Sequence, residues 1–118
     1  MEETEFLPVE YSSKTKVLHK ILFYVDNNYS KECTLKKIAK ELQYDYAYIS
    51  KLFVQMMQMT FTEYLNHYRV SQACYLLRNS PQSITEIAFN CGYDNLRTFN
   101  RNFKKVTKQS PSAYRDLA

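Results

Sequence analysis

Residues 34–45 read TLKKIAKELQYD, and residues 83–94 read SITEIAFNCGYD. The two stretches align without a gap at an offset of 49 residues, which brings a Thr or Ser, several apolar positions, an alanine and a Tyr-Asp pair into register. Chance matches roughly two or three apolar positions, but not the polar first residue, the alanine and the Tyr-Asp pair together. The match continues at an offset of 50 after a one-residue insertion, with these pairs: Ile49 with Phe99, Lys51 with Arg101, Phe53 with Phe103, Thr60 with Ser110, and Tyr64 with Tyr114.

Each copy has the spacing of a helix-turn-helix unit. A small residue, Ala39 or Ala88, allows the two helices of the unit to approach each other closely. A tight turn follows, and then a second helix whose outward residues near the N-terminus can enter a major groove of DNA. The N-cap residues that we expect are Thr34, Asp45, Ser83, and either Asp94 or Asn95.

A long helix separates the two copies. Helical periodicity predicts it over about residues 61–79, opened by a capping box of Thr60 and Glu63 and ended by Ser80-Pro81. Another helix is expected to end near Asn28, and a short last one to begin at Pro111. The fold class that we predict is all-α, with about seven helices forming two helix-turn-helix subdomains joined by a long central helix. The expected ranges are helix-turn-helix 1 over about 34–57, the linker helix over about 61–79, and helix-turn-helix 2 over about 83–106.

The composition fits one compact domain built from helices. Of the 118 residues, 45% are hydrophobic and 24% are charged, so the chain can bury a core. A single glycine and three prolines leave few turn signals for a fold with many hairpins. We expect one domain over residues 13–118.

Charge is distributed unevenly along the chain. Residues 1–12 hold four glutamates, Pro8 and no basic residue, and we interpret them as an acidic linker or leader. Residues 13–118 hold 16 basic against 8 acidic residues, a net charge of +8. A basic domain suits a polyanionic partner such as nucleic acid.

The sequence lacks the patterns that usually carry catalysis or metal binding. The three cysteines form no C-x-x-C pair, and His19 and His67 are isolated from each other. No glycine-rich phosphate loop and no arrangement of nucleophile, histidine and carboxylate occurs. We therefore expect no enzyme activity, no cofactor and no metal.

The sequence also lacks membrane signals. It has no basic-then-apolar signal pattern at its start and no apolar run of the roughly 18 residues that a spanning helix needs. We expect no membrane partner and a cytoplasmic location.

Four strings make the similarity to a known family specific: LKKIAKELQYDYAYISKLF (35–53), MTFTEYLNHYRVSQACYLL (59–77), SITEIAFNCGYDNLRTFNRNFKK (83–105) and QSPSAYR (109–115). Over about residues 13–116 the chain resembles the DNA-binding domain of AraC/XylS-family bacterial transcription regulators. One helix-turn-helix match would be a weak signal, whereas two in this order around this linker helix are a strong one. The resemblance implies sequence-specific binding of double-stranded DNA that regulates transcription.

Some positions depart from the pattern of that family. It usually has glycine where this chain has Gln43, Gln58 and Lys108, and a positive φ at these positions would cost on the order of 1 kcal/mol each. Thr98 replaces a common aromatic residue, and Asn102 stands where an apolar residue is frequent.

The resemblance also implies that outward residues of both recognition helices contact DNA. In the second helix, Arg97, Asn100 and Arg101 lie opposite the inward phenylalanines, and Arg with guanine and Asn with adenine are the pairings that major-groove geometry favours. A solvated helix face is the alternative for the first helix, and local packing is the alternative for Leu96. The base-contacting candidates are Tyr46, Ala47, Ser50, Lys51, Leu96, Arg97, Asn100 and Arg101. The candidates for phosphate contacts, or simply for solvent exposure, are Lys36, Lys37, Lys40, Lys104, Lys105 and Lys108.

A rival hypothesis is a helical protein-interaction module that kept the fold and lost DNA binding. The stripe of Arg and Asn side chains argues against it, because protein interfaces favour aromatic and apolar faces. Further partners that we weigh are RNA polymerase and an upstream sensor, receiver or dimerisation domain outside this chain. The acidic, proline-containing leader favours such an upstream domain.

Overall fold

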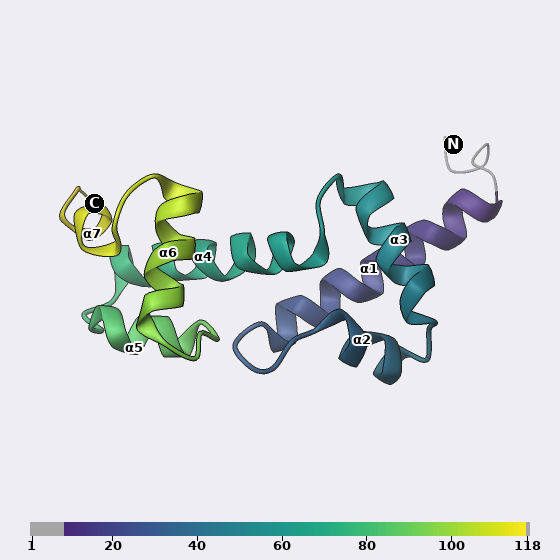
Figure 1. Cartoon of the computed structure of the whole chain (residues 1–118), viewed down its shortest axis with the longest axis horizontal. Helices are drawn as coiled ribbons and strands as arrows, with labels where there is room; N and C mark the ends of the chain where they lie inside the picture. Colours follow the sequence, from purple (N-terminus) through teal and green to yellow (C-terminus); the bar gives the residue numbers. More distant parts are fainter. Residues whose placement is uncertain (1–8, 118) are drawn as a thin grey trace. The chain divides into compact units, whose positions relative to one another are not determined.

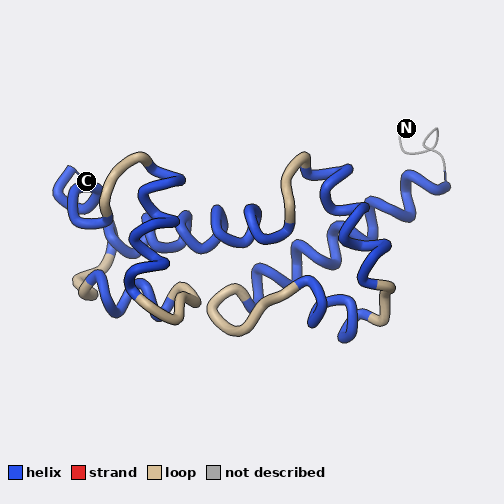
Figure 2. The backbone as a smooth tube through the Cα atoms, in the orientation of Figure 1, coloured by secondary structure: helices blue, strands red, loops and turns tan. Residues whose placement is uncertain are grey.

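The computed structural model describes residues 9–117, and every regular element in this range is an α-helix (Figure 2). Figure 1 shows the seven helices in chain order. They are α1 (Val9–Asn28), α2 (Leu35–Leu42), α3 (Tyr46–Met57), α4 (Phe61–Asn79), α5 (Ile84–Asn90), α6 (Leu96–Thr107) and α7 (Pro111–Leu117). The predicted all-α class and the predicted number of helices are confirmed for this part of the chain.

The helices form two compact units. Among the described residues, the first unit holds residues 9–27 and 34–61, and the second holds residues 28–33 and 62–117. The boundary thus falls at the start of α4, and the loop after α1 belongs to the second unit. Each unit contains one helix-turn-helix pair, α2 with α3 and α5 with α6.

The first unit buries one apolar stripe from each of its helices. Ile21 and Val25 of α1, Ile38 of α2, and Ile49 and Phe53 of α3 are completely buried. In α1 and α3 these pairs are four residues apart, so they lie on one face of their helix and fix which residues must point outward. The ring of Phe53 meets that of Phe61 edge-on, with 5.6 Å between the ring centroids.

The second unit has a core that is richer in aromatic rings. Val70, Ala73 and Leu77 of α4 pack with Ile87, Ala88 and Cys91, and with a row of rings from the α5–α6 turn and α6. Centroid distances of 5.4 Å from Tyr93 to Phe99, 5.6 Å from Phe99 to Phe103 and 5.6 Å from Phe103 to Tyr114 describe this row. The row fixes the inward face of α6.

The helix starts follow the expected N-caps. The side chains of Thr34, Asp45 and Ser83 accept hydrogen bonds from backbone N–H groups three residues further on. Ser83 and Glu86 form the predicted capping box in full. Of the two alternatives for α6, Asn95 is the N-cap.

Three of the turns contain a non-glycine residue in the left-handed region. Gln43 has a φ of 63°, Gln58 of 61° and Lys108 of 68°. Each of them is the C-cap of its helix, and each donates its backbone N–H to the carbonyl four residues earlier. These are the three positions at which the resembling family usually has glycine, so the positive φ considered above is present at all of them.

The first helix begins earlier than the sequence pattern indicates. Periodicity is recognisable only after residue 13, whereas α1 starts at Val9. The stretch before residue 13 has no apolar stripe, so the pattern could not mark the start of the helix. Residues 1–8 of the predicted leader lie outside the described residues. Across residues 9–117, no helix combines the length and the apolar character that crossing a bilayer requires.

Candidate nucleic-acid interface

The helix α3, predicted to be the first recognition helix, presents an exposed face opposite its buried residues. Ile49, Leu52 and Phe53 are at most 2% exposed. Tyr46, Ala47 and Lys51 are exposed on the other side, and Ser50 is half-buried at the edge between the two faces. The structure therefore leaves all four side chains accessible, Ser50 the least.

The helix α6, predicted to be the second recognition helix, is divided more sharply into a buried and an exposed face. Phe99 and Phe103 are completely buried. The exposed residues of α6 are Leu96, Arg97, Asn100, Arg101, Lys104 and Lys105. Two guanidinium groups and one amide lie on adjacent turns of this face. Their hydrogen-bond donors and acceptors complement those that base edges present in a major groove.

The lysines proposed for phosphate contacts fall into two groups. Lys36, Lys37 and Lys40 lie on α2, where Lys37 is half-buried and the other two are exposed. The Lys36 ammonium stands 5.7 Å from the centre of the Tyr46 ring, which joins one phosphate candidate to one base candidate in the first unit. Lys104, Lys105 and Lys108 are exposed at the C-terminal end of α6. The Lys108 ammonium donates a hydrogen bond of 3.2 Å to the Lys105 carbonyl.

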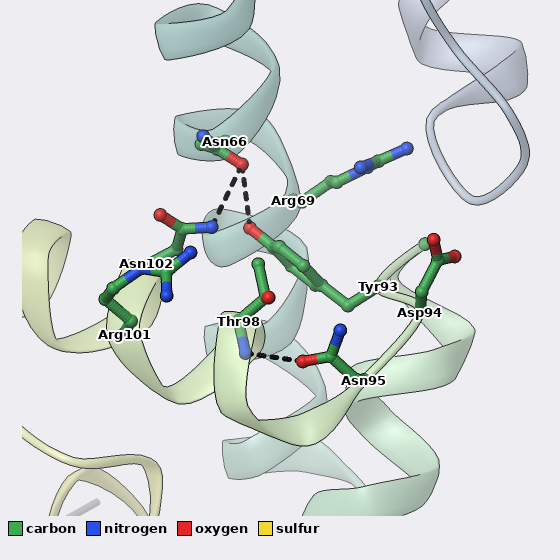
Figure 3. A pocket seen from close by; sticks show the side chains of 9 residues that line it. Asn66, Arg69, Tyr93, Asp94, Asn95, Thr98, Arg101 and Asn102 are labelled. Carbon is green, nitrogen blue, oxygen red and sulfur yellow. Dashed lines mark hydrogen bonds between the residues drawn. The ribbon is translucent and has the colours of Figure 1, made fainter.

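A polar network joins α6 to α4 beside the recognition face. The Asn66 Oδ1 atom accepts hydrogen bonds from the Tyr93 hydroxyl at 3.2 Å and from the Asn102 Nδ2 atom at 3.4 Å (Figure 3). These side chains line a crevice of about 360 Å³ together with Asn95, Thr98, Arg101 and others. Arg101, a candidate base reader, thus lies next to the network on the same helix.

Arg69 and Gly92 form the rear of this crevice. The Arg69 guanidinium points away from Asn66 in Figure 3 and donates to the carbonyls of Tyr29 at 2.8 Å and Lys31 at 3.0 Å. Gly92 has a φ of 101°, and a Cβ atom there would stand 2.5 Å from the Tyr29 carbonyl oxygen and 2.7 Å from the Arg69 Nε atom. Glycine is therefore needed here for both its conformation and its size.

Burial raises the pKa of two side chains in this core. It raises the pKa of the Cys91 thiol to about 11, with the Arg69 charge acting in the opposite direction. It raises the pKa of the Tyr93 hydroxyl to about 12, again against the charge of Arg69. Both groups are therefore neutral at physiological pH.

Sequence reasoning did not single out Asn66 and Arg69. Both lie on α4 and are half-buried, a place where a polar side chain needs a partner. The departure of Thr98 and Asn102 from the resembling family was the available signal. Both residues line the crevice that Asn66 and Arg69 border.

Within residues 9–117, no group of three or more His, Cys, Asp or Glu side chains is arranged to hold a metal ion. The three cysteines are free thiols, two of them buried.

Comparisons with known proteins agree with this geometry. A family of helix-turn-helix domains matches residues 38–116, more than half of the chain. The transcriptional regulator YijO of Escherichia coli is 33% identical over 108 residues, which cover 91% of this chain and 38% of that protein. The chain thus spans little more than a third of that relative.

Solved structures show the same fold. The C-terminal domain of AraT, a response regulator from Geobacillus stearothermophilus, is 29% identical with a TM-score of 0.84, covering 86% of this chain and 85% of that one. The DNA-binding domain of AdpA, solved in complex with a target DNA, is 22% identical with a TM-score of 0.80, covering 85% of this chain and 90% of that one.

The matched family consists of transcription regulators and not of enzymes. With its duplicated helix-turn-helix unit, the chain belongs to the AraC family of bacterial helix-turn-helix transcription regulators, as a DNA-binding domain.

Proposed function

We propose that this domain binds double-stranded DNA sequence-specifically to regulate transcription, with α3 and α6 as recognition helices in successive major grooves. The observation that carries the proposal is the face of α6. Arg97, Asn100 and Arg101 are exposed there, while Phe99 and Phe103 anchor the opposite face completely inside the core. An anchored helix with an Arg and Asn stripe is the arrangement that direct readout requires.

The first unit supports the same role with a weaker stripe. Lys51 occupies in α3 the position that Arg101 occupies in α6, and both side chains are exposed. Lys51 can reach a guanine edge or a phosphate, while the methyl group of Ala47 can meet a thymine methyl. The lysines of α2 and of the end of α6 then serve to hold the phosphate backbone.

The relatives point in the same direction. The AdpA domain, which shares the fold, was solved on a target DNA, and we extend that mode of binding to this chain. AraT is a response regulator of which the similar part is the C-terminal domain. We therefore propose that a sensor, receiver or dimerisation domain works together with this one, in the bacterial cytoplasm.

Two alanine variants distinguish a contact with a DNA base from a contact with the phosphate backbone. Arg101→Ala removes a bidentate guanine contact, so it should weaken the cognate site by about 1–3 kcal/mol and relax preference at one base pair. Lys105→Ala removes at most one phosphate contact, so it should weaken all sequences about equally and lower the salt slope by about one unit. The measurement is a titration of cognate and scrambled duplexes at two salt concentrations, after a cognate site has been selected from a random pool.

The outcomes distinguish the proposals. Equal weakening of both duplexes by Arg101→Ala would make Arg101 a backbone anchor and remove α6 as a base reader. If the wild-type domain selects no sequence and neither variant changes binding to any duplex, the domain is a protein-interaction module instead.

A further inference from the structure

The inward face of α6 contains one polar residue where the first unit has an apolar one. Asn102 follows Phe99 by three residues and precedes Phe103, so it lies at the edge of the buried stripe. At the repeat offset of 50, its counterpart in α3 is Leu52, which is 2% exposed. The two recognition helices are therefore attached to their units by different chemistry.

Asn102 finds its partner on α4. The Asn66 Oδ1 atom accepts from the Asn102 Nδ2 atom at 3.4 Å and from the Tyr93 hydroxyl at 3.2 Å, so one oxygen collects donors from α6 and from the turn that precedes it. Tyr93 itself is only 5% exposed, so its ring is held in the core while its hydroxyl reaches Asn66. Figure 3 shows the Tyr93 and Asn102 side chains converging on this oxygen.

The bonds to Asn66 lie at the edge of the core, where α6 borders the crevice. The rings of Phe99 and Phe103 pack in one core cluster with Val70, Ala73 and Leu77 of α4, and Asn102 lies beside them at the open, polar crevice. This packing fixes which face of α6 points inward, but apolar contacts have little directional preference, so they resist a small rotation about the helix axis less sharply than a hydrogen bond does. Hydrogen bonds have directions, and a roll of α6 would break the bond from Asn102.

We propose that Asn66 is a positioning residue for base recognition: through Asn102 it fixes the rotation of α6, and with it the aim of Arg97, Asn100 and Arg101. The proposal rests on the proposed function, because it concerns how the second unit reads DNA. Asn102 is the direct neighbour of Arg101 in the chain, so a rotation that moves one moves the other. Asn66 itself needs no contact with DNA in this role.

A double-mutant cycle with leucine substitutions tests the proposal. Asn66→Leu, Asn102→Leu and the double variant are compared with Ser71→Leu, an exposed position on the same helix that serves as the control. For each protein, affinities are measured for the selected duplex and for duplexes with one changed base pair in the block read by α6 or in the block read by α3.

Asn66→Leu should lower the ratio of affinities for the selected and the changed duplex by about fivefold when the changed base pair lies in the α6 block, the net effect of losing roughly one hydrogen bond. The same ratio should stay unchanged when the changed base pair lies in the α3 block. The double variant should lose less than the two single changes combined, because two leucines can pack as Leu52 does. Ser71→Leu should change neither block.

Other results would overturn the assignment. If Asn66→Leu lowers discrimination equally in both blocks, or lowers only the melting temperature, Asn66 is a structural residue. Amide hydrogen exchange of the free domain gives a readout that needs no DNA: Asn66→Leu should accelerate exchange in α6 more than in α5. An equal effect on both helices would contradict the proposal, whereas a wild-type domain that selects no DNA sequence would contradict the proposed function alone.

Discussion

Gln43 ends α2 in a conformation that favours glycine. Its φ of 63° lies in the left-handed region, where its Cβ atom costs on the order of 1 kcal/mol. Gln43→Gly should therefore raise the free energy of unfolding by up to about 1 kcal/mol, less the entropy that glycine adds to the unfolded chain. DNA affinity should remain nearly unchanged, because Gln43 lies outside the exposed faces of α3 and α6. Urea denaturation and a binding titration measure both effects.

The neighbouring residue Glu41 provides the matched control. It is exposed and lies within α2, so Glu41→Gly should lower the free energy of unfolding by up to about 1 kcal/mol. Opposite signs at two positions two residues apart would identify backbone conformation as the cause. If Gln43→Gly lowers the melting temperature as well, the turn does not gain from glycine.

Two buried groups make stability depend on alkaline pH. Burial raises the pKa of the Cys91 thiol from 9.0 to about 11, and that of the Tyr93 hydroxyl from 10.0 to about 12. Above pH 9 the unfolded chain loses these protons while the folded chain keeps them, so the stabilisation, complete below pH 9, decreases as the pH rises. Between pH 9 and 11 Cys91 should contribute a slope of up to about 1.4 kcal/mol per pH unit.

Removing the thiol isolates its share of this slope. Cys91→Ala should flatten the dependence of the unfolding free energy on pH between 9 and 10, where tyrosine ionisation contributes less. Denaturation curves at pH 8, 9 and 10 for both proteins give the slopes. An unchanged slope in the alanine variant would show that Cys91 ionises as easily in the folded domain as in the unfolded chain.

At the scale of the helices, the second unit uses the same kind of arginine contact twice. Arg69 on α4 donates to the carbonyls of Tyr29 and Lys31, and Arg115 on α7 donates to those of Leu77 at 3.1 Å and Ser80 at 3.2 Å. Lys31 and Ser80 are equivalent at the repeat offset of 49. Each arginine thus holds the loop that precedes one helix-turn-helix pair, although the two arginines are 46 residues apart and so are not equivalent at either repeat offset.

The planar fork of arginine explains why two carbonyls can be held at once. Arg69→Lys and Arg115→Lys should each lower the free energy of unfolding by about 1 kcal/mol, because lysine cannot reproduce both bonds. Arg97→Lys, on the exposed face of α6, is the control and should leave stability nearly unchanged. Thermal unfolding compares the three variants. Equal melting temperatures for all of them would show that these two contacts do not stabilise the fold.

Local interactions made much of the fold predictable at this scale. The N-caps at Thr34, Asp45 and Ser83 bond to N–H groups three residues away, and such short-range bonds are visible in the sequence. Asn66 could not be found in the same way, because its partners are 27 and 36 residues distant. Those contacts exist only after α4, α5 and α6 have packed.

The candidate site shows the same division. Buried Phe99 and Phe103 determine which residues of α6 face outward, so its exposed stripe followed from periodicity. Residues at the edge of a stripe are less certain, and Ser50 is indeed half-buried. The contact between Lys36 and the Tyr46 ring depends on the angle between α2 and α3, which no sequence pattern encodes.

At the scale of the whole molecule, the duplication makes a prediction about the DNA site. If both copies contact bases as proposed, they should read different bases, since Lys51 in α3 corresponds to Arg101 in α6 and Ala47 to Arg97. A single chain carrying both copies therefore needs two different blocks of sequence, not a palindrome. If the helices enter successive major grooves of one DNA face, the centres of these blocks lie about 10 base pairs apart.

Hydroxyl-radical footprinting of the selected duplex should show two short protected blocks, related by no two-fold symmetry. Lys51→Ala should weaken protection in one block and Arg101→Ala in the other, because each side chain belongs to a different recognition helix. Band shifts at increasing protein concentration should give one complex containing one chain, because both blocks are read by the same molecule. A single protected block, strict two-fold symmetry, or two variants that weaken the same block would show that the two copies do not read DNA side by side.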